Sequence, residues 1–161
     1  MSGRTEGARI LAVDYGRARM GLAVADAQAR LARPLGILAR KNRNEDLRRL
    51  REIVREHGVK RIVIGLPLRL DGSKGEMAEE VERFAERVRK QIGLPVELVD
   101  ERLTSWEAEN LLEEKGGGRS GRAVNSGRKQ KKENAKSVDA LAAAVILREY
   151  LARAERAGKG A

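Results

Sequence analysis

Apolar positions in the first third of the chain follow a strand pattern and then a helix pattern. Residues 9–15 and 20–25 are short apolar runs separated by a glycine-containing turn, which predicts a β-hairpin. A third strand is expected at residues 36–39. From Asn44, taken as the helix N-cap, apolar residues recur on one helical face until Gly58, so the first helix is expected there.

The middle of the chain alternates strand and helix patterns. Residues 61–66 form a continuous apolar run that ends at a proline, which is typical of a strand covered on both faces. Ser73 and Glu76 have the spacing of a capping box, and apolar residues at helical spacing follow them as far as Gly93. Residues 95–100 then predict a further strand.

Two more helices are expected in the last third of the chain. Thr104 and Glu107 can cap a helix over residues 104–114, and the alanine- and leucine-rich segment 137–151 predicts the last one. A hairpin followed by alternating helices and strands implies an α/β fold with a mixed sheet between helices. We expect a single domain over residues 1–151 and a flexible tail from 152 to 161.

Charge changes this picture because it is concentrated in one segment. The chain has a formal net charge of +10, and residues 115–136 contribute most of it. This segment is also rich in glycine, so we interpret residues 116–133 as a mobile cationic loop that orders on a phosphate backbone. The other explanation of such a run is a solvated loop without a ligand. A polyanionic partner, namely nucleic acid, is therefore expected.

Composition excludes several classes of protein. Aromatic residues make up only 2% of the chain, so stacking of bases on exposed rings is not expected as the main binding mode. The absence of cysteine excludes disulfides and thiolate metal sites, and it favours a reducing, cytoplasmic compartment. We see no apolar run long enough to cross a bilayer, so no membrane partner is expected.

Acidic residues stand where the predicted elements end or begin. Asp14 ends the first strand, Asp100 and Glu101 end the strand at 95–100, and Asp139 lies in the first turn of the last expected helix. Each has an ordinary explanation when taken alone: a turn residue, an ion pair with Arg102, or an acid at a helix N-terminus. Because each borders an apolar element of one core, we expect the acids to converge at one edge of the sheet.

Converging carboxylates would make an oxygen-rich metal site. Such a site suits Mg²⁺ or Mn²⁺, whereas zinc prefers nitrogen or sulfur ligands. With two ions bound, one would activate the attacking water and the other would stabilise the leaving 3′ oxygen. No histidine is then required, and His57, at the end of a helix, is explained by the helix dipole.

Four motifs follow one another over about residues 9–151. They are ILAVDYGRARMGLAVAD, RIVIGLPLRLDGSKGEMA, VELVDERLTSWEA and KSVDALAAAVIL. The chain resembles the YqgF (RuvX) family of Holliday junction resolvases, which belong to the ribonuclease-H-like superfamily. The resemblance implies a ribonuclease-H-like fold with a mixed five-stranded sheet, antiparallel through strands 1–3 and then parallel, flanked by helices on both faces.

The resemblance also implies site residues. Asp14, Glu101 and Asp139 would be the catalytic carboxylates, and Asp100 could share or exchange the role of Glu101 as a metal ligand. Mg²⁺ or Mn²⁺, as two ions, would be the cofactor. The expected contacts to nucleic acid are basic residues near the acids or in the cationic loop. These are Arg17, Arg19, Arg102, Arg119, Arg122, Arg128, Lys129, Lys131 and Lys132.

Two functions remain open at this point. The first is a metal-dependent endonuclease that acts on branched DNA or on structured precursor ribosomal RNA, as a possible homodimer matched to a two-fold symmetric junction. The second is a non-catalytic nucleic-acid-binding module, against which the retained acids argue. A relation to actin-like ATPases would require a second, duplicated domain, and the chain is too short for one.

Overall fold

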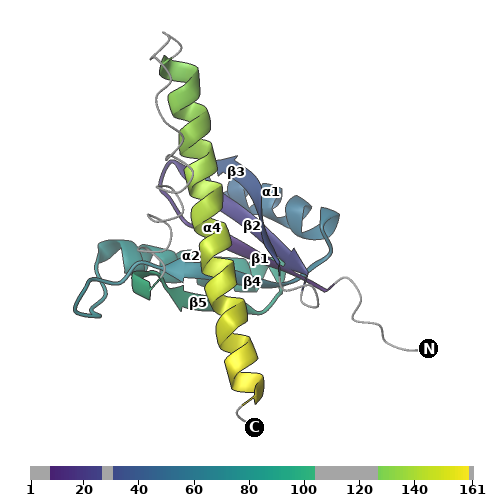
Figure 1. The fold of residues 1–161 in the computed structure, drawn as a ribbon. Helices are drawn as coiled ribbons and strands as arrows, with labels where there is room; N and C mark the ends of the chain where they lie inside the picture. Colours follow the sequence, from purple (N-terminus) through teal and green to yellow (C-terminus); the bar gives the residue numbers. More distant parts are fainter. Residues whose placement is uncertain (1–7, 27–30, 104–126, 160–161) are drawn as a thin grey trace.

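The computed structural model describes residues 8–26, 31–103 and 127–159, and its centre is a five-stranded sheet with helices on both faces (Figure 1). The strands and helices of this part of the chain have the following bounds. They are β1 (Arg9–Asp14), β2 (Arg19–Asp26), β3 (Ala32–Ala39), α1 (Arg43–Glu56), β4 (Val59–Leu66), α2 (Glu76–Ile92), β5 (Val96–Asp100), the 3₁₀ helix η1 (Glu101–Leu103) and α4 (Gly127–Lys159).

The sheet has the strand order β3-β2-β1-β4-β5. β1 pairs antiparallel with β2, and β2 pairs antiparallel with β3. β4 is parallel to both of its neighbours, β1 and β5. The predicted mixed sheet, antiparallel first and then parallel, is therefore confirmed, and it places the carboxyl ends of β1, β4 and β5 at the same edge.

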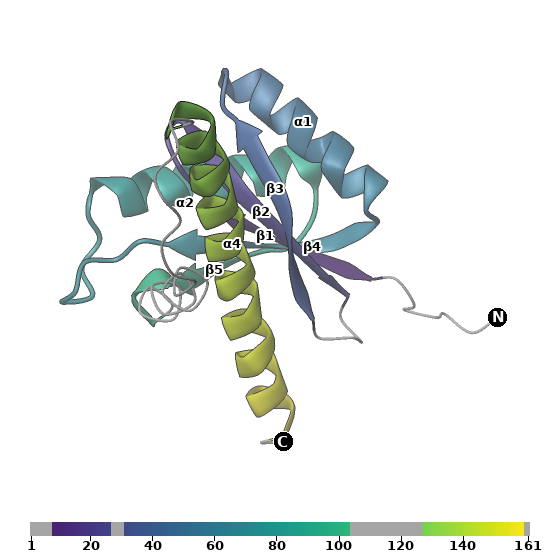
Figure 2. The same cartoon turned by 45° about the horizontal axis from the view of Figure 1, so that its top comes forward.

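Alternate residues of the strands build two cores, one on each face of the sheet. Leu11 and Ile62 lie in the core that contacts α1 and α2. Ala12 and Val63, the next residue of each strand, lie in the core under α4. Figures 1 and 2 show α4 crossing its face of the sheet, with α1 and α2 on the other face. Each face is thus covered by helices, as the continuous apolar run in β4 predicted.

Both predicted helix caps are wrong in detail. α1 is capped by Asn42, not Asn44, because the Asn42 side chain accepts a hydrogen bond from the Glu45 amide at 2.9 Å. Ser73 does not cap α2, because its amide and hydroxyl both donate to the Asp71 carboxylate, at 2.9 and 2.6 Å. The N-cap of α2 is Gly75, two residues after the expected cap Ser73, and it makes no side-chain hydrogen bond.

The last helix is longer than expected at both ends. It begins at Gly127 and ends at Lys159, so residues 127–133 of the expected loop and 152–159 of the expected tail are helical. Residues 128–136 contain no glycine or proline and are mostly good helix formers, which explains the early start. Asp139 therefore lies inside the helix, not in its first turn. The expected helix at 104–114 lies outside the described residues.

None of the helices described for residues 8–26, 31–103 and 127–159 is both long enough and apolar enough to cross a membrane.

Candidate active site at one edge of the sheet

The carboxyl ends of the parallel strands bring the predicted acids to one edge of the sheet. Asp14 is the last residue of β1 and Asp100 is the last residue of β5, with β4 between them. Side chains alternate along a strand, so Asp14 faces the same side as Ala12, which is the side covered by α4. Asp139 lies on that helix. The fold thus directs Asp14 toward the helix that carries the third acid.

Glu101 is hydrogen-bonded to Asp14. It is the first residue of η1, directly after β5, and its side chain reaches back to the Asp14 carboxylate. Burial, the charge of Asp14 and this hydrogen bond together raise the pKa of Glu101 to about 8. At neutral pH Glu101 is therefore protonated and donates a hydrogen bond to the Asp14 carboxylate.

The pKa of Asp14, the second member of this pair, is also shifted. Burial raises the pKa of Asp14, and the charge of Asp139 adds to the rise, while the hydrogen bond from Glu101 opposes it. Asp14 and Glu101 therefore form a pair of carboxyl groups whose ionised forms are disfavoured by burial and by the neighbouring acids. Such perturbed groups are typical of functional sites, although structural ion pairs can also produce them.

Asp139 is close enough to influence Asp14, but its carboxylate is paired with Arg19 of β2. The structure therefore brings Asp14 and Glu101 into contact and places Asp139 beside them, held by an arginine. Within the described residues, no group of three or more histidine, cysteine, aspartate or glutamate side chains is arranged so that it could hold a metal ion.

Two glycines make room for this arrangement, and the sequence interpretation missed them. Gly21 pairs with Asp14 across β1 and β2, and a Cβ on Gly21 would overlap the backbone of Asp139. A Cβ on Gly65 of β4 would lie 2.8 Å from Cγ of Glu101 and 2.7 Å from Cδ1 of Ile146. The absence of side chains at these positions lets α4 and Glu101 approach the strand ends. A glycine inside an apolar strand is the signal that could have indicated this close approach.

Asp100 and Glu101 are adjacent in sequence but have different partners. The Asp100 carboxylate accepts hydrogen bonds from the Arg102 amide at 3.0 Å and from the Arg102 guanidinium at 2.7 Å. These bonds hold the pKa of Asp100 below its ordinary value. Glu101 therefore occupies the position next to Asp14, whereas Asp100 fixes Arg102.

Glu80 of α2 organises the turn that follows Asp14. Its carboxylate accepts a hydrogen bond from the Tyr15 hydroxyl at 2.8 Å and pairs with Arg17 at 3.1 Å. The Tyr15 hydrogen bond, followed by the Arg17 contacts, lowers the pKa of Glu80. No local pattern links these residues, which are more than sixty positions apart in the chain, and sequence reasoning did not identify Glu80.

Arg40 supports the same turn from the end of β3. Its guanidinium lies over the Tyr15 ring, 4.6 Å from the centroid, and donates to the Gly16 carbonyl at 3.1 Å. It also pairs at 3.2 Å with Asp46, which is only 2% exposed. A buried carboxylate with an arginine partner is costly to disrupt, so this contact anchors the turn between β1 and β2.

The expected nucleic-acid contacts are divided between this edge and the last helix. Arg17, Arg19 and Arg102 all lie at the edge, and each is paired with an acid. Four others belong to the first turns of α4, and two lie outside the described residues. The four are Arg128, Lys129, Lys131 and Lys132, and the two are Arg119 and Arg122.

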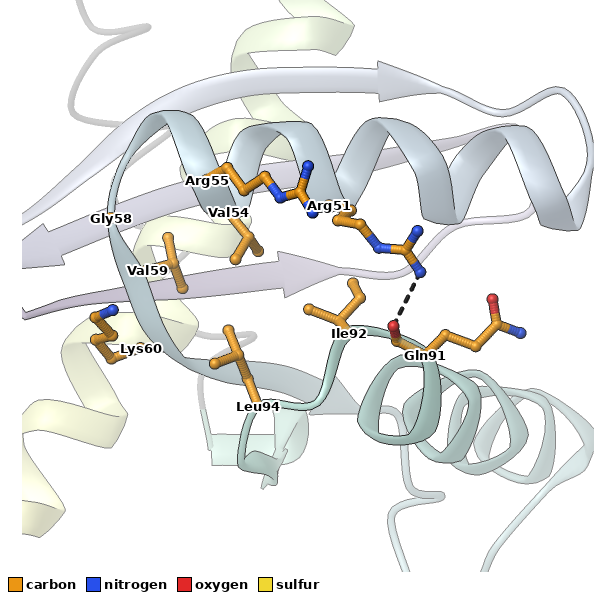
Figure 3. Close-up of a pocket in the computed structure, with 9 residues that line it drawn as sticks. All are labelled: Arg51, Val54, Arg55, Gly58, Val59, Lys60, Gln91, Ile92 and Leu94. Atoms are coloured by element: carbon orange, nitrogen blue, oxygen red, sulfur yellow. Dashed lines mark hydrogen bonds between the residues drawn. The ribbon is translucent and has the colours of Figure 1, made fainter.

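A hollow of about 510 Å³ lies at the opposite edge of the sheet, between the ends of α1 and α2 and the start of β4 (Figure 3). Basic side chains are expected near the carboxyl ends of α1 and α2, because free carbonyl groups accumulate there. Arg51, for example, donates to the Gln91 carbonyl at 2.9 Å. The hollow is separate from the acids. Its lining residues are Arg51, Val54, Arg55, Gly58, Val59, Lys60, Gln91, Ile92 and Leu94.

Solved structures with this arrangement define the class of the fold. RuvC of T. thermophilus in complex with a Holliday junction substrate matches 92% of this chain and 96% of its own, with a TM-score of 0.50 and 17% identity. The Fowlpox virus resolvase, solved with Holliday junction DNA, matches 90% of this chain and 97% of its own, with a TM-score of 0.53 and 10% identity. The fold is therefore the ribonuclease-H-like fold of RuvC-type resolvases, as predicted.

Sequence comparison identifies the family within this class. The model of the RuvX family, described as Holliday junction resolvase, matches residues 8–153. A protein of Anaeromyxobacter sp. strain K is 45% identical over 145 residues, covering 90% of this chain and 97% of its own. One of Thermosynechococcus vestitus is 37% identical over 142 residues, covering 88% and 86%. Both relatives are assigned by name as pre-16S rRNA nucleases. The chain belongs to the RuvX family, which confirms the resemblance seen in its motifs.

Proposed function

We propose that the chain is a divalent-metal-dependent nuclease whose catalytic carboxylates are Asp14, Glu101 and Asp139. The observation that carries the proposal is the hydrogen-bonded pair of Asp14 and Glu101 at the sheet edge, with Asp139 close enough to raise the pKa of Asp14. Membership of a nuclease family supports it. A purely structural role would not explain why acids whose ionised forms are disfavoured by burial are gathered at this point.

The donor set fits Mg²⁺ or Mn²⁺, because every candidate ligand is a carboxylate oxygen. Asp14, Glu101 and Asp139 would hold the metal, with Asp100 as a further ligand if Arg102 released it. In the structure the acids are compensated by the proton on Glu101 and by the guanidinium of Arg19. A bound cation would replace both. When bound, it would supply an activated water and stabilise the leaving oxygen.

The residues of the chain itself would orient the substrate. Arg19 would be free to contact a phosphate at the same edge if Asp139 held the metal, and Arg102 is held in place beside Glu101 by Asp100. Arginine binds phosphate through two parallel hydrogen bonds, which would fix the strand relative to the carboxylates. The Glu80 contacts to Tyr15 and Arg17 would hold the neighbouring turn during this exchange.

We propose structured nucleic acid as the substrate, with precursor 16S ribosomal RNA first and a four-way DNA junction second. The names of relatives that are 37–45% identical favour the RNA, and the description of the family favours the junction. The basic segment that includes Arg119 and Arg122 would add salt-dependent contacts to the phosphate backbone of either substrate.

A cleavage panel tests the proposal. The full chain is incubated with precursor RNA, four-way junction, duplex and single-stranded DNA, each with Mg²⁺ or Mn²⁺ and with EDTA. We expect cutting that requires the metal, and we expect Asp14→Asn to remove it while leaving binding within about threefold of wild type. Glu86→Gln, which changes an exposed acid of α2 far from the edge, is the matched control.

Two results would count against the proposal. If Asp14→Asn cuts at the wild-type rate, the carboxylate pair is not the catalytic site. If the wild-type chain binds nucleic acid in a salt-dependent manner but forms no product with either metal, the chain is a non-catalytic binding module.

A further inference from the structure

The loop between β4 and α2 carries a leucine whose side chain is exposed to solvent. Leu70 is 96% exposed, the highest value among the exposed large hydrophobic residues in the described part of the chain. Figure 2 shows this loop projecting from the body of the molecule next to α2. Removing a leucine side chain from water is favourable, and the fold itself gains nothing from Leu70 in this position.

The loop holds Leu70 in a defined position. The Asp71 carboxylate accepts from both the amide and the hydroxyl of Ser73. The Gly72 amide donates to the Arg69 carbonyl at 2.8 Å, and the Arg69 amide donates to the Ser73 carbonyl at 3.0 Å. Gly72 has a φ of +88°, which favours glycine and closes the turn. Leu70 therefore lies at the tip of a hydrogen-bonded turn.

Arg102 connects this tip to the acids. Its guanidinium donates to the Leu70 carbonyl at 3.2 Å and pairs with Asp100 at 2.7 Å. Glu101, which contacts Asp14, lies between Asp100 and Arg102 in sequence. The tip of the loop is thus fixed relative to the carboxylate pair.

The charges around the tip suit a nucleic acid rather than an apolar protein surface. Arg69 makes no ion pair with any residue in the described ranges, and Arg102, which is paired with Asp100, donates to the Leu70 carbonyl of the same turn. Lys74 lies at the same loop, paired with Glu82 at 3.0 Å. The acid at the tip, Asp71, keeps its negative charge, because hydrogen bonds from Ser73 lower its pKa, and the nearby charge of Arg102 offsets it. Cations flanking one exposed apolar side chain are typical of proteins that bind the phosphate backbone and insert a wedge between bases.

We infer that Leu70 is a wedge that inserts between two bases of the strand bound at the acid pair. This inference rests on the proposed function and deepens it, because it names the feature of the substrate that is selected. Inserting a wedge requires unstacking of bases, which costs least where pairing is already interrupted. Leu70 would therefore direct cutting to branches and bulges, in preference to continuous duplex.

A fluorescent base analogue tests the wedge independently of cutting. The full chain carrying Asp14→Asn is bound to a bulged RNA duplex and to a four-way DNA junction, each with 2-aminopurine at successive positions. Unstacking increases the fluorescence of this base. Leu70→Ser removes the wedge, Leu70→Met keeps its apolar character, and Leu31→Ser is the matched control, since Leu31 is 64% exposed and precedes β3.

We expect a fluorescence rise at one position with the unchanged loop, with Leu70→Met and with Leu31→Ser, but not with Leu70→Ser. Binding by Leu70→Ser should stay within about threefold, since phosphate contacts dominate affinity. With Asp14 restored, Leu70→Ser should cut the bulged substrate about tenfold more slowly and lose its preference over duplex.

The two proposals fail in different ways. An equal fluorescence rise with Leu70→Ser, or no rise at any position on binding, overturns the wedge even if the wild-type chain cuts. A rise that depends on Leu70 in a chain that never cuts supports the wedge and overturns the nuclease.

Discussion

Replacing Glu101 by glutamine should stabilise the metal-free protein at high pH. Glu101 has an ordinary pKa of 4.5, which the folded structure raises to about 8 through burial and the charge of Asp14. Between these two values the folded state binds a proton that the unfolded state does not bind. The free energy of unfolding therefore falls as the pH rises through this window and levels off above it. Glutamine cannot ionise and can still donate a hydrogen bond to Asp14.

The size of this stabilisation follows from the pKa shift of Glu101. Each pKa unit corresponds to about 1.4 kcal/mol, so moving from 4.5 to about 8 sets an upper bound of about 4 to 5 kcal/mol. Glu101 is only partly buried, and small local movements can admit water to an ionised carboxylate. We therefore expect about 2 to 3 kcal/mol of stabilisation by Glu101→Gln above pH 8 and almost none near pH 5.

Urea unfolding in EDTA at about pH 5, 7 and 9 measures this difference. The control is Glu86→Gln, which makes the same substitution at an exposed acid that pairs with Arg89 on the surface of α2. Mn²⁺ should raise the stability of the wild-type protein at high pH and change that of Glu101→Gln much less, because metal binding stabilises only the protein that keeps its ligands. A pH-independent difference between Glu101→Gln and wild type would refute this reasoning.

Two further predictions concern the packing around the site and the N-cap of helix α1. Gly65→Ala places a Cβ 2.8 Å from Cγ of Glu101, so it should destabilise the protein by about 1 to 3 kcal/mol in urea unfolding and slow metal-dependent cutting. Unchanged rates would show that Glu101 need not hold its position. Asn42→Ala removes the side-chain cap of α1 and should cost about 1 kcal/mol by the same measurement, with no change in the rate of cutting.

That Asp14 lies near the acids at the end of β5, Asp100 and Glu101, was predictable because strand direction can be inferred from the order of strand and helix patterns. A hairpin followed by helix and strand units places β1, β4 and β5 parallel, and their carboxyl ends then share an edge. Which of these two acids contacts Asp14 was not predictable. The alternation of a strand ends where η1 begins, and only the turn of η1 directs Glu101, not Asp100, to Asp14.

Other features were missed because they depend on contacts between distant segments or on weak local signals. The pairing of Arg19 with Asp139 joins β2 to α4, and nothing near either residue in sequence indicates it. The start of α4 was misplaced because the residues before Ser137 favour a helix but carry no apolar face that would have revealed one. Asn42 and Asn44 are both good caps, and only the observed hydrogen bond distinguishes them.

The position of α4 has a consequence for biosynthesis. This helix carries Asp139, and Ile146 packs beside Glu101, yet both residues are translated after every strand of the sheet. A growing chain exposes its amino-terminal part first and is elongated at about 5 to 20 residues per second. The ribosome therefore releases Asp139 only after the whole sheet, and a chain that terminated before α4 would lack the third acid and the helix that covers one face of the sheet.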